Sequence, residues 1–228
     1  MGSMHTGLEE KRGGYSKLAE FYAERVRGGV GLIVTGGISP NRAGVTVFGG
    51  SRMSNFLHVR KHKLITEAVH NEGGKIIMQI LHAGRYAYTP FCVAPSAIKA
   101  PINKFKPKAL SSRGVRKTIN DYVHSAKLAQ KAGYDGVEVM GSEGYLINEF
   151  IASETNKRTD EWGGSFENRI KFPIEIVKRI REEIGPDFII MFRLSMLDLV
   201  AEGSDWAEVE KLAVKIESSG ADVINTGI

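Results

Sequence analysis

Residues 73–85 decide the fold class of this chain, and they read Gly-Gly-Lys-Ile-Ile-Met-Gln-Ile-Leu-His-Ala-Gly-Arg. The centre of the stretch, Lys75-Ile76-Ile77-Met78-Gln79-Ile80, is almost continuously apolar. An apolar run that does not alternate with polar residues is typical of a strand covered on both faces. The stretch therefore predicts a strand of a parallel sheet with helices packed outside it.

The same pattern occurs on both sides of this stretch. Other apolar runs follow a glycine or polar break at 31–34, 136–140, 188–193 and 221–225. Between them, apolar residues recur at three- and four-residue spacing, which predicts helices over 17–27, 58–71, 115–132, 167–183 and 206–219. Ser165 stands where it can cap the helix that includes Glu167. This alternation predicts an α/β fold and leaves open whether the sheet is doubly wound or closed into a barrel.

The composition is that of an ordinary globular protein. A length of 228 residues with 42% hydrophobic and 25% charged residues suits one α/β domain or two small ones. The formal charge of +5 comes from lysines and arginines that are spread along the chain. Such dispersion favours a solvated basic surface over nucleic-acid binding, and a positive surface can also attract an anionic substrate such as a CoA ester.

The cysteine count and the hydropathy pattern bear on the compartment. Cys92 is the only cysteine, so no internal disulfide can form and an iron–sulfur site has too few ligands within this chain. No apolar run approaches the ~20 residues of a membrane helix, and the N-terminus has no hydrophobic signal core. The histidines at 58, 62 and 70 show no HExxH pattern and no paired carboxylate. We therefore expect a cytoplasmic protein with no membrane span and no metal site.

Polar residues stand where the predicted strands end, which is where parallel α/β folds bind ligands. The amide of Gln79 matches the edge of a uracil-like ring, such as the flavin pyrimidine, or supports a loop by a hydrogen bond. Arg193 is costly to bury without an anion, so it predicts either a flavin edge or an internal ion pair. Glu143 and Tyr145 follow the run 136–140, and a tyrosine hydroxyl can donate a proton to a carbanion-like carbon.

The connections carry one further signal and one absence. Residues 81–112 form a long, proline-containing stretch directly after a predicted strand, and such a loop is typical of an active site. The glycine-rich phosphate motifs GxGxxG and GxxxxGK[ST] do not occur after a strand, so neither of those loops would hold a nucleotide.

A longer motif adds a family resemblance. The chain resembles the old yellow enzyme superfamily in the signature N-x-R-x-D-x-[WY]-G-G-[SD]-x-x-N-R, here Asn156-Lys157-Arg158-Thr159-Asp160-Glu161-Trp162-Gly163-Gly164-Ser165-Phe166-Glu167-Asn168-Arg169. Two further matches are Gln79-Ile80-Leu81-His82-Ala83-Gly84-Arg85 and the pair of segments 133–139 and 144–150. The similarity covers nearly the whole chain.

The resemblance implies a closed (β/α)8 TIM barrel with non-covalent FMN at its C-terminal face. It implies that Gly2, Ser3 and Met4 end the first strand and contact the flavin. It gives the same role to Gly36, Gln79 and Arg193 on the next strands, and it leaves the roles of His82 and Arg85 open.

The fourth strand indicates the subfamily. Many old yellow enzymes carry a histidine and an asparagine where this chain has Met140 and Glu143. The segment 140–150 and the segment 193–198 are instead similar to bacterial FMN-dependent 2,4-dienoyl-CoA reductases, enzymes of fatty acid β-oxidation. The resemblance then implies that Tyr145 protonates the substrate and that Glu143 orients or tunes this tyrosine. It also implies that NADPH is the ultimate hydride donor.

The resemblance also predicts an incomplete barrel. Residues 1–228 would be one partial FMN-binding TIM-barrel domain that lacks the start of the first strand and the last two βα units, which hold the FMN phosphate in such enzymes. The partner histidine that assists the tyrosine would fall a few residues past Ile228. The intact parent would add an FAD and a 4Fe-4S cluster outside this chain. Two alternatives stay open: a related ene-reductase or amine dehydrogenase, and an inactive partial barrel that serves only as a binding or packing module.

Overall fold

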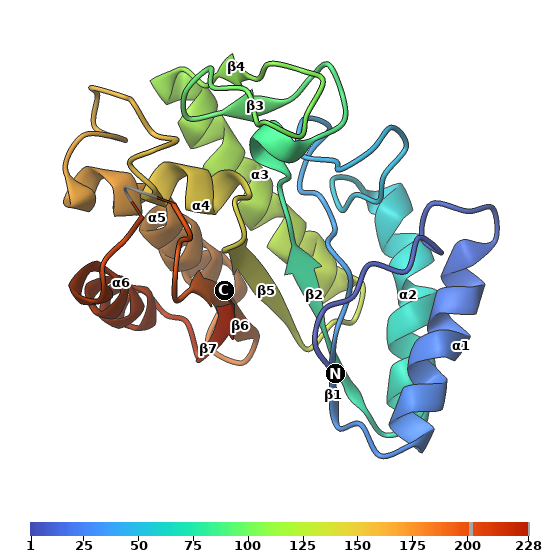
Figure 1. The fold of residues 1–228 in the computed structure, drawn as a ribbon. Helices are drawn as coiled ribbons and strands as arrows, with labels where there is room; N and C mark the ends of the chain where they lie inside the picture. The colour runs from blue at the N-terminus through green and yellow to red at the C-terminus, as the bar shows by residue number, and fades with distance from the viewer. Residues whose placement is uncertain (201–202, 228) are drawn as a thin grey trace.

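The computed structural model describes residues 1–200 and 203–227, and its centre is one parallel sheet (Figure 1). The strands follow one another in the order β1-β2-β5-β6-β7, each paired in parallel with the next. Their bounds are β1 (Leu32–Val34), β2 (Lys75–Ile80), β5 (Gly136–Gly141), β6 (Ile189–Ser195) and β7 (Val223–Gly227). All five predicted apolar runs are confirmed as strands, with ends that differ by one or two residues.

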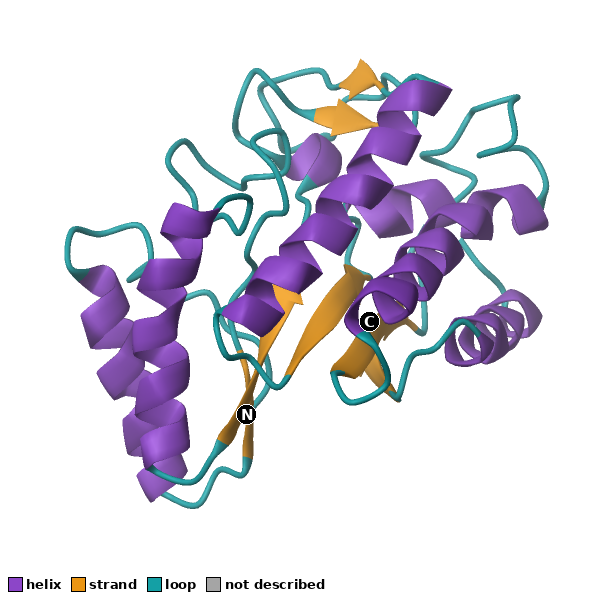
Figure 2. Cartoon of the chain, turned by 180° about the vertical axis from the view of Figure 1, so that it is seen from behind, coloured by secondary structure: helices purple, strands orange, loops and turns teal. Residues whose placement is uncertain are grey.

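A helix precedes each strand and lies on the outer face of the sheet. The helices are α1 (Gly14–Arg27), α2 (Phe56–Asn71), α3 (Ser112–Lys131), α5 (Phe166–Ile184) and α6 (Trp206–Ser218), with a short α4 (Leu146–Ile151) after β5. Figure 2, the view from behind, shows α3 and α5 in front of the strands, with α1 and α2 to one side of the sheet and α6 to the other. Sequential strand order with helices on one side is the arrangement of a barrel and not of a doubly wound sheet, so the chain forms a partial (β/α)8 barrel.

The N-terminal segment lies beside β1. The Met1 amino group donates to the carbonyl of Leu32 at 2.6 Å, and the Val34 N–H donates to the carbonyl of Met1 at 2.9 Å. These two bonds have the slanted pattern of a parallel ladder. Residues 2–4 therefore continue from the position that a first strand would take in the barrel.

Successive strand residues face opposite sides of the sheet, and this alternation separates the core from the barrel interior. The outward residues pack under the helices in the main core, which includes Ile33, Ile76, Met78, Val137, Val139, Ile190 and Phe192. The inward residues Val34, Ile77 and Met191 form a small apolar layer of their own. One or two positions further along the same faces, the inward side chains become polar, and that change marks the candidate site.

The helix ends follow local chemistry. The Ser165 hydroxyl accepts from the Asn168 N–H at 3.4 Å, which confirms the predicted cap of α5. Gly133 and Gly185 adopt φ values of 87° and 80° after α3 and α5. Glycine reaches this left-handed region at little cost, so the chain can leave each helix and enter the next strand. In the part of the chain that the structure describes, no helix is long and apolar enough to cross a bilayer.

The long stretch after β2 is ordered by the signature segment. It contains a 3-10 turn, η1 (Gly84–Tyr86), and two short paired strands, β3 (Val93–Ala94) and β4 (Lys108–Ala109). The Arg158 guanidinium donates to the carbonyl of Pro95 at 2.9 Å and to that of Leu110, and it forms a bidentate pair with Asp160 at 2.9 and 2.6 Å. The signature segment is thus hydrogen-bonded to the loop after β2 at two points, Pro95 and Leu110.

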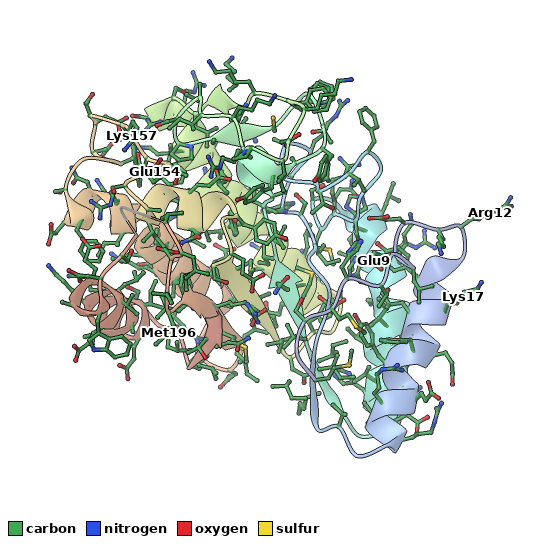
Figure 3. All side chains as sticks on the ribbon, in the orientation of Figure 1. Glu9, Arg12, Lys17, Glu154, Lys157 and Met196 are labelled. Carbon is green, nitrogen blue, oxygen red and sulfur yellow. The ribbon has the colours of Figure 1, made fainter. Side chains whose placement is uncertain are left out.

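Replacing Arg158 with alanine is expected to lower the free energy of unfolding by about 2–4 kcal/mol. The side chain is only 9% exposed, and its loss leaves the Pro95 and Leu110 carbonyls without this donor and the Asp160 carboxylate without its cation. Urea denaturation checks the expectation. Arg12→Ala is the matched control, because Arg12 projects into solvent before α1 (Figure 3). Equal midpoints for the two variants would contradict the anchoring role of Arg158.

Candidate active site

A cavity of about 380 Å³ lies at the carboxyl ends of the strands. Its walls come from the N-terminal segment, from the turns after β1, β2 and β5, and from β6. The lining residues are Ser3, His5, Gly37, Thr46, Val47, Gln79, Leu81, Tyr88, Met140, Glu143, Tyr145 and Arg193. Five of the predicted site residues, far apart in the sequence, meet here: Ser3, Gln79, Glu143, Tyr145 and Arg193.

A buried carboxylate fixes Gln79. Glu138 faces the barrel interior beside Gln79 in register and is fully buried. Its carboxylate accepts from Gln79 Nε2 at 2.6 Å and from Asn225 Nδ2 at 2.6 Å. Because the amide nitrogen of Gln79 is engaged, its oxygen Oε1 is the atom left beside Gly37 at the cavity wall. The site therefore presents an acceptor at this point.

Sequence reasoning missed Glu138 and did not select Asn225. The available signal for Glu138 was a single carboxylate inside the apolar run Gly136-Val137-Glu138-Val139-Met140. A buried carboxylate needs hydrogen-bond partners, so its presence in a central strand predicts polar neighbours at the same level of the sheet. Gln79 and Asn225 are those neighbours.

Arg193 pairs with Glu143. Glu143 Oε1 accepts from Arg193 Nε at 2.9 Å and from Arg193 Nη2 at 2.7 Å. Glu143 has a φ of 61°, the only positive value among the described residues other than glycine. Backbone strain of this kind collects at functional sites, and here it accompanies a turn that brings the carboxylate over the end of β6. The internal ion pair foreseen for Arg193 exists, and Arg193 also lines the cavity.

Tyr145 precedes α4 at the mouth of the cavity. Burial raises the pKa of the Tyr145 hydroxyl, and the nearby carboxylate of Glu143 and the hydroxyl of Tyr86 raise it further. The ring of Tyr86 meets that of Tyr145 edge-on, with 6.2 Å between the centroids. The phenol therefore keeps its proton at neutral pH and is held in place from one side.

The remaining predicted residues lie around the cavity without lining it. Gly2 and Met4 flank Ser3 and are exposed. A methyl group added at Gly36 would meet the Met4 carbonyl oxygen at 2.8 Å, so this glycine allows the N-terminal segment to approach the end of β1. Gly37, the next residue, is the one that faces Gln79.

His82 and Arg85 support the wall behind the cavity. His82 is fully buried, its Nδ1 accepts from the Gly84 N–H at 3.1 Å, and burial lowers its pKa to about 3, so the ring is neutral. The Arg85 N–H donates to Glu149 Oε1 at 2.8 Å, and the Arg85 side chain lines a separate, neighbouring cavity of about 250 Å³. These contacts give both residues a structural role in the loop after β2.

Comparison with known proteins assigns the chain to a family. The model of the NADH:flavin oxidoreductase / NADH oxidase family matches residues 1–227. The NADH oxidase of Thermoanaerobacter brockii is 36% identical over 233 residues, which cover 99% of this chain and 36% of that protein. This chain therefore spans about a third of the length of that relative.

Two solved structures share the fold. A 2-naphthoyl-CoA reductase in complex with 2-naphthoyl-CoA has a TM-score of 0.85 and 31% identity, over 93% of this chain and 35% of that one. The old yellow enzyme homologue from Zymomonas mobilis has a TM-score of 0.83 and 30% identity, over 92% of this chain and 62% of that one. The matched length, the barrel and the identity together show that this chain belongs to the NADH:flavin oxidoreductase / NADH oxidase family, within the old yellow enzyme superfamily.

Proposed function

We propose that this chain forms the FMN-binding, substrate-reducing face of an oxidoreductase that reduces the C=C bond of a 2,4-dienoyl-CoA or related enoyl thioester, with NADPH as the ultimate donor. The observation that carries the proposal is the meeting of Gln79, Arg193, Glu143 and Tyr145 around one cavity. These side chains combine a hydrogen-bond acceptor, a cation, a carboxylate and a proton donor.

The residues fit a flavin ring. The free oxygen of Gln79 suits the ring N–H of a uracil-like edge, and Gly37 leaves the space that a side chain would fill beside it. Arg193 lies at the cavity wall, where a cation favours the negatively charged reduced ring. Ser3, with Gly2 and Met4 on either side, would cover another edge, and Gly36 would hold that segment in place.

A side chain of this protein would protonate the substrate. FMN, when bound, supplies hydride to one carbon of the double bond. Tyr145 would then donate its proton to the neighbouring carbon, since its raised pKa keeps the phenol protonated until it is used. Glu143 would tune that proton through its charge and hold Arg193 in position.

Two observations support a CoA thioester as the substrate class. The 2-naphthoyl-CoA reductase that shares the fold is bound to 2-naphthoyl-CoA, and this complex supports a CoA thioester as the substrate. The net charge of +5 favours an anionic substrate of that type. The family match supports FMN as the cofactor, whereas the FAD and the 4Fe-4S cluster implied for an intact parent stay predictions.

Titration with FMN, followed by quenching of flavin fluorescence, tests the cofactor site. We expect saturable binding, about tenfold weaker in Gln79→Ala and about 10- to 100-fold weaker in Arg193→Ala, because the first loses a neutral and the second a charge-assisted hydrogen bond. Arg12→Ala is the control for the loss of a cation and should bind as the unchanged chain does. Saturable binding that neither site variant weakens would refute this placement of the flavin.

Competition between substrates tests the specificity. The flavin-loaded protein is offered a 2,4-dienoyl-CoA and a simple cyclic enone together with NADPH as the reductant, and product formation is followed for each. Preference for the thioester supports the proposal, whereas preference for the enone indicates a general ene-reductase on the same barrel.

A further inference from the structure

A second cavity, of about 350 Å³, lies between residues 42–52, after β1, and residues 89–91, after β2. Its lining differs in chemistry from that of the first cavity. It consists of two arginines, two phenylalanines, a threonine and small residues: Arg42, Val45, Phe48, Gly49, Gly50, Arg52, Thr89 and Phe91. Nothing in the proposed reduction uses these side chains.

The second cavity is adjacent to the candidate catalytic cavity. The Tyr88 N–H donates to the Thr46 carbonyl at 2.7 Å and ties the two loops together. Thr46 and Tyr88 line the catalytic cavity, whereas the adjacent residues Val45 and Thr89 line the second one. Adjacent residues of the same two backbone segments therefore line the two cavities.

The two arginines give this second cavity a positive charge that favours an anionic ligand. Arg42 and Arg52 have no hydrogen bond or ion pair within residues 1–200 and 203–227, and no carboxylate lines the cavity. The Arg42 guanidinium lies over the ring of Phe91, 4.5 Å from its centroid. Stacking on a ring holds the guanidinium in position and leaves its N–H groups free for a planar or tetrahedral anion, most suitably a phosphate.

The rest of the lining fits an aromatic base and a polar group. The Phe48 side chain is 73% exposed, and its centroid lies 6.4 Å from that of Phe91, so an exposed ring face is available for stacking. Thr89 lines the cavity and is only 2% exposed, and its buried hydroxyl has no hydrogen-bond partner among the described residues. A buried polar atom without a partner is uncommon and points to a ligand that supplies one.

We infer that this cavity binds the phosphorylated adenosine end of a nucleotide substrate, with Arg42 and Arg52 on the phosphates, Phe48 against the adenine and Thr89 on a polar atom of the ligand. The inference rests on the proposed function, because a CoA thioester must place its reactive end in the catalytic cavity while its nucleotide lies elsewhere. NADPH carries the same chemistry with its phosphate on the 2′ rather than the 3′ oxygen.

Calorimetric titration of the flavin-free chain with 3′,5′-ADP and with 2′,5′-ADP tests the inference. We expect saturable binding that weakens about tenfold in Arg42→Gln, in Arg52→Gln and in Phe48→Ala, from the loss of a charge-assisted contact or of base stacking. Arg113→Gln removes an exposed arginine on α3 and should leave binding unchanged. Preference for 3′,5′-ADP identifies the CoA end as the ligand, and preference for 2′,5′-ADP identifies NADPH.

Two outcomes would overturn the inference: no saturable binding by a folded chain, or binding that is as tight in both arginine variants as in the unchanged chain. The second outcome would mean that another surface, or a second copy of the chain, takes the nucleotide. Neither outcome affects the FMN titration, which reports on the catalytic cavity alone. Failure of FMN binding with intact nucleotide binding would instead overturn the proposed function and leave the nucleotide site standing.

Discussion

Replacing Tyr145 with phenylalanine is expected to slow reduction of an enoyl thioester by about 10²- to 10⁴-fold while flavin affinity stays the same. The change removes only the hydroxyl oxygen, so the ring keeps its edge-on contact with Tyr86. Without that phenol, water must deliver the proton to the substrate carbon. Turnover of the flavin-loaded protein with a dienoyl-CoA and NADPH measures the effect, and fluorescence titration checks the flavin.

The matched control is Tyr134→Phe. The Tyr134 hydroxyl bonds to His62 Nδ1 at 2.7 Å, beneath the helices and outside the cavity, so its loss should affect stability and not turnover. Tyr145→Phe activity within about twofold of the unchanged protein would refute the proton-donor role. The pH profile gives a second readout, because the raised pKa of Tyr145 implies no loss of activity from its ionisation below pH 10.

The sequence predicted the elements well because hydrophobic periodicity and end signals agreed. Runs such as 136–140 and 188–193 are apolar since strands β5 and β6 are covered by helices on one side and by the barrel interior on the other. Periodicity could not distinguish the barrel from a doubly wound sheet, because both arrangements bury their strands on two faces. The one-sided helical layer, visible in Figure 2, is a tertiary property, and only the resemblance to a family anticipated it.

The sequence predicted several residues of the candidate site but not the hydrogen bonds between them. Gln79, Arg193 and Tyr145 could be chosen as polar residues at strand ends. Their hydrogen-bond pairing could not be predicted, because Glu138 lies 59 residues from Gln79 and Glu143 lies 50 residues from Arg193, so only the fold brings them together. The pairing changes the chemistry: Gln79 presents an oxygen because Glu138 takes its nitrogen.

The signature segment shows that the most recognisable sequence need not be the reactive one. Asn156 Nδ2 donates to the carbonyls of Phe150 and Trp162, and Arg158 holds the loop after β2. These are backbone-directed bonds, which constrain residue identity strictly without touching the cavity. The motif therefore identifies the fold of the loop region, whereas the residues that line the candidate cavity include several in the turns after β1, β2 and β5.

Glu149 provides the largest expected effect on stability. It is 1% exposed on α4, Oε1 accepts from the Arg85 N–H at 2.8 Å, and Oε2 has no partner among the described residues. Burial raises the pKa of this carboxyl to about 8, against the opposing pull of the Arg85 N–H and guanidinium. A carboxyl in the unfolded chain has its ordinary pKa near 4.5. Between these two values the folded state keeps a proton that the unfolded state has lost.

The sign of the pH dependence follows from that difference. Where the folded state binds more protons, the free energy of unfolding falls as the pH rises, here by about 1.4 kcal/mol per unit between pH 5 and 8. Glu149→Gln keeps the acceptor for the Arg85 N–H and cannot ionise. We therefore expect the variant to be more stable than the unchanged protein at pH 8, by about 3–4 kcal/mol, and to differ little from it at pH 5.

Urea denaturation of both proteins at pH 5, 6, 7 and 8 measures this difference, and subtracting the two curves removes every other titrating group. The neighbours of Glu149 do not titrate in this window, because burial raises the pKa values of Tyr122 and Cys92 and lowers that of His82 to about 3. Glu154→Gln, an exposed residue just after α4 (Figure 3), is the control and should give a curve parallel to that of the unchanged protein. A parallel curve for Glu149→Gln as well would mean that Glu149 is ionised in the folded state, held by Arg85 as an internal ion pair rather than as a neutral acid.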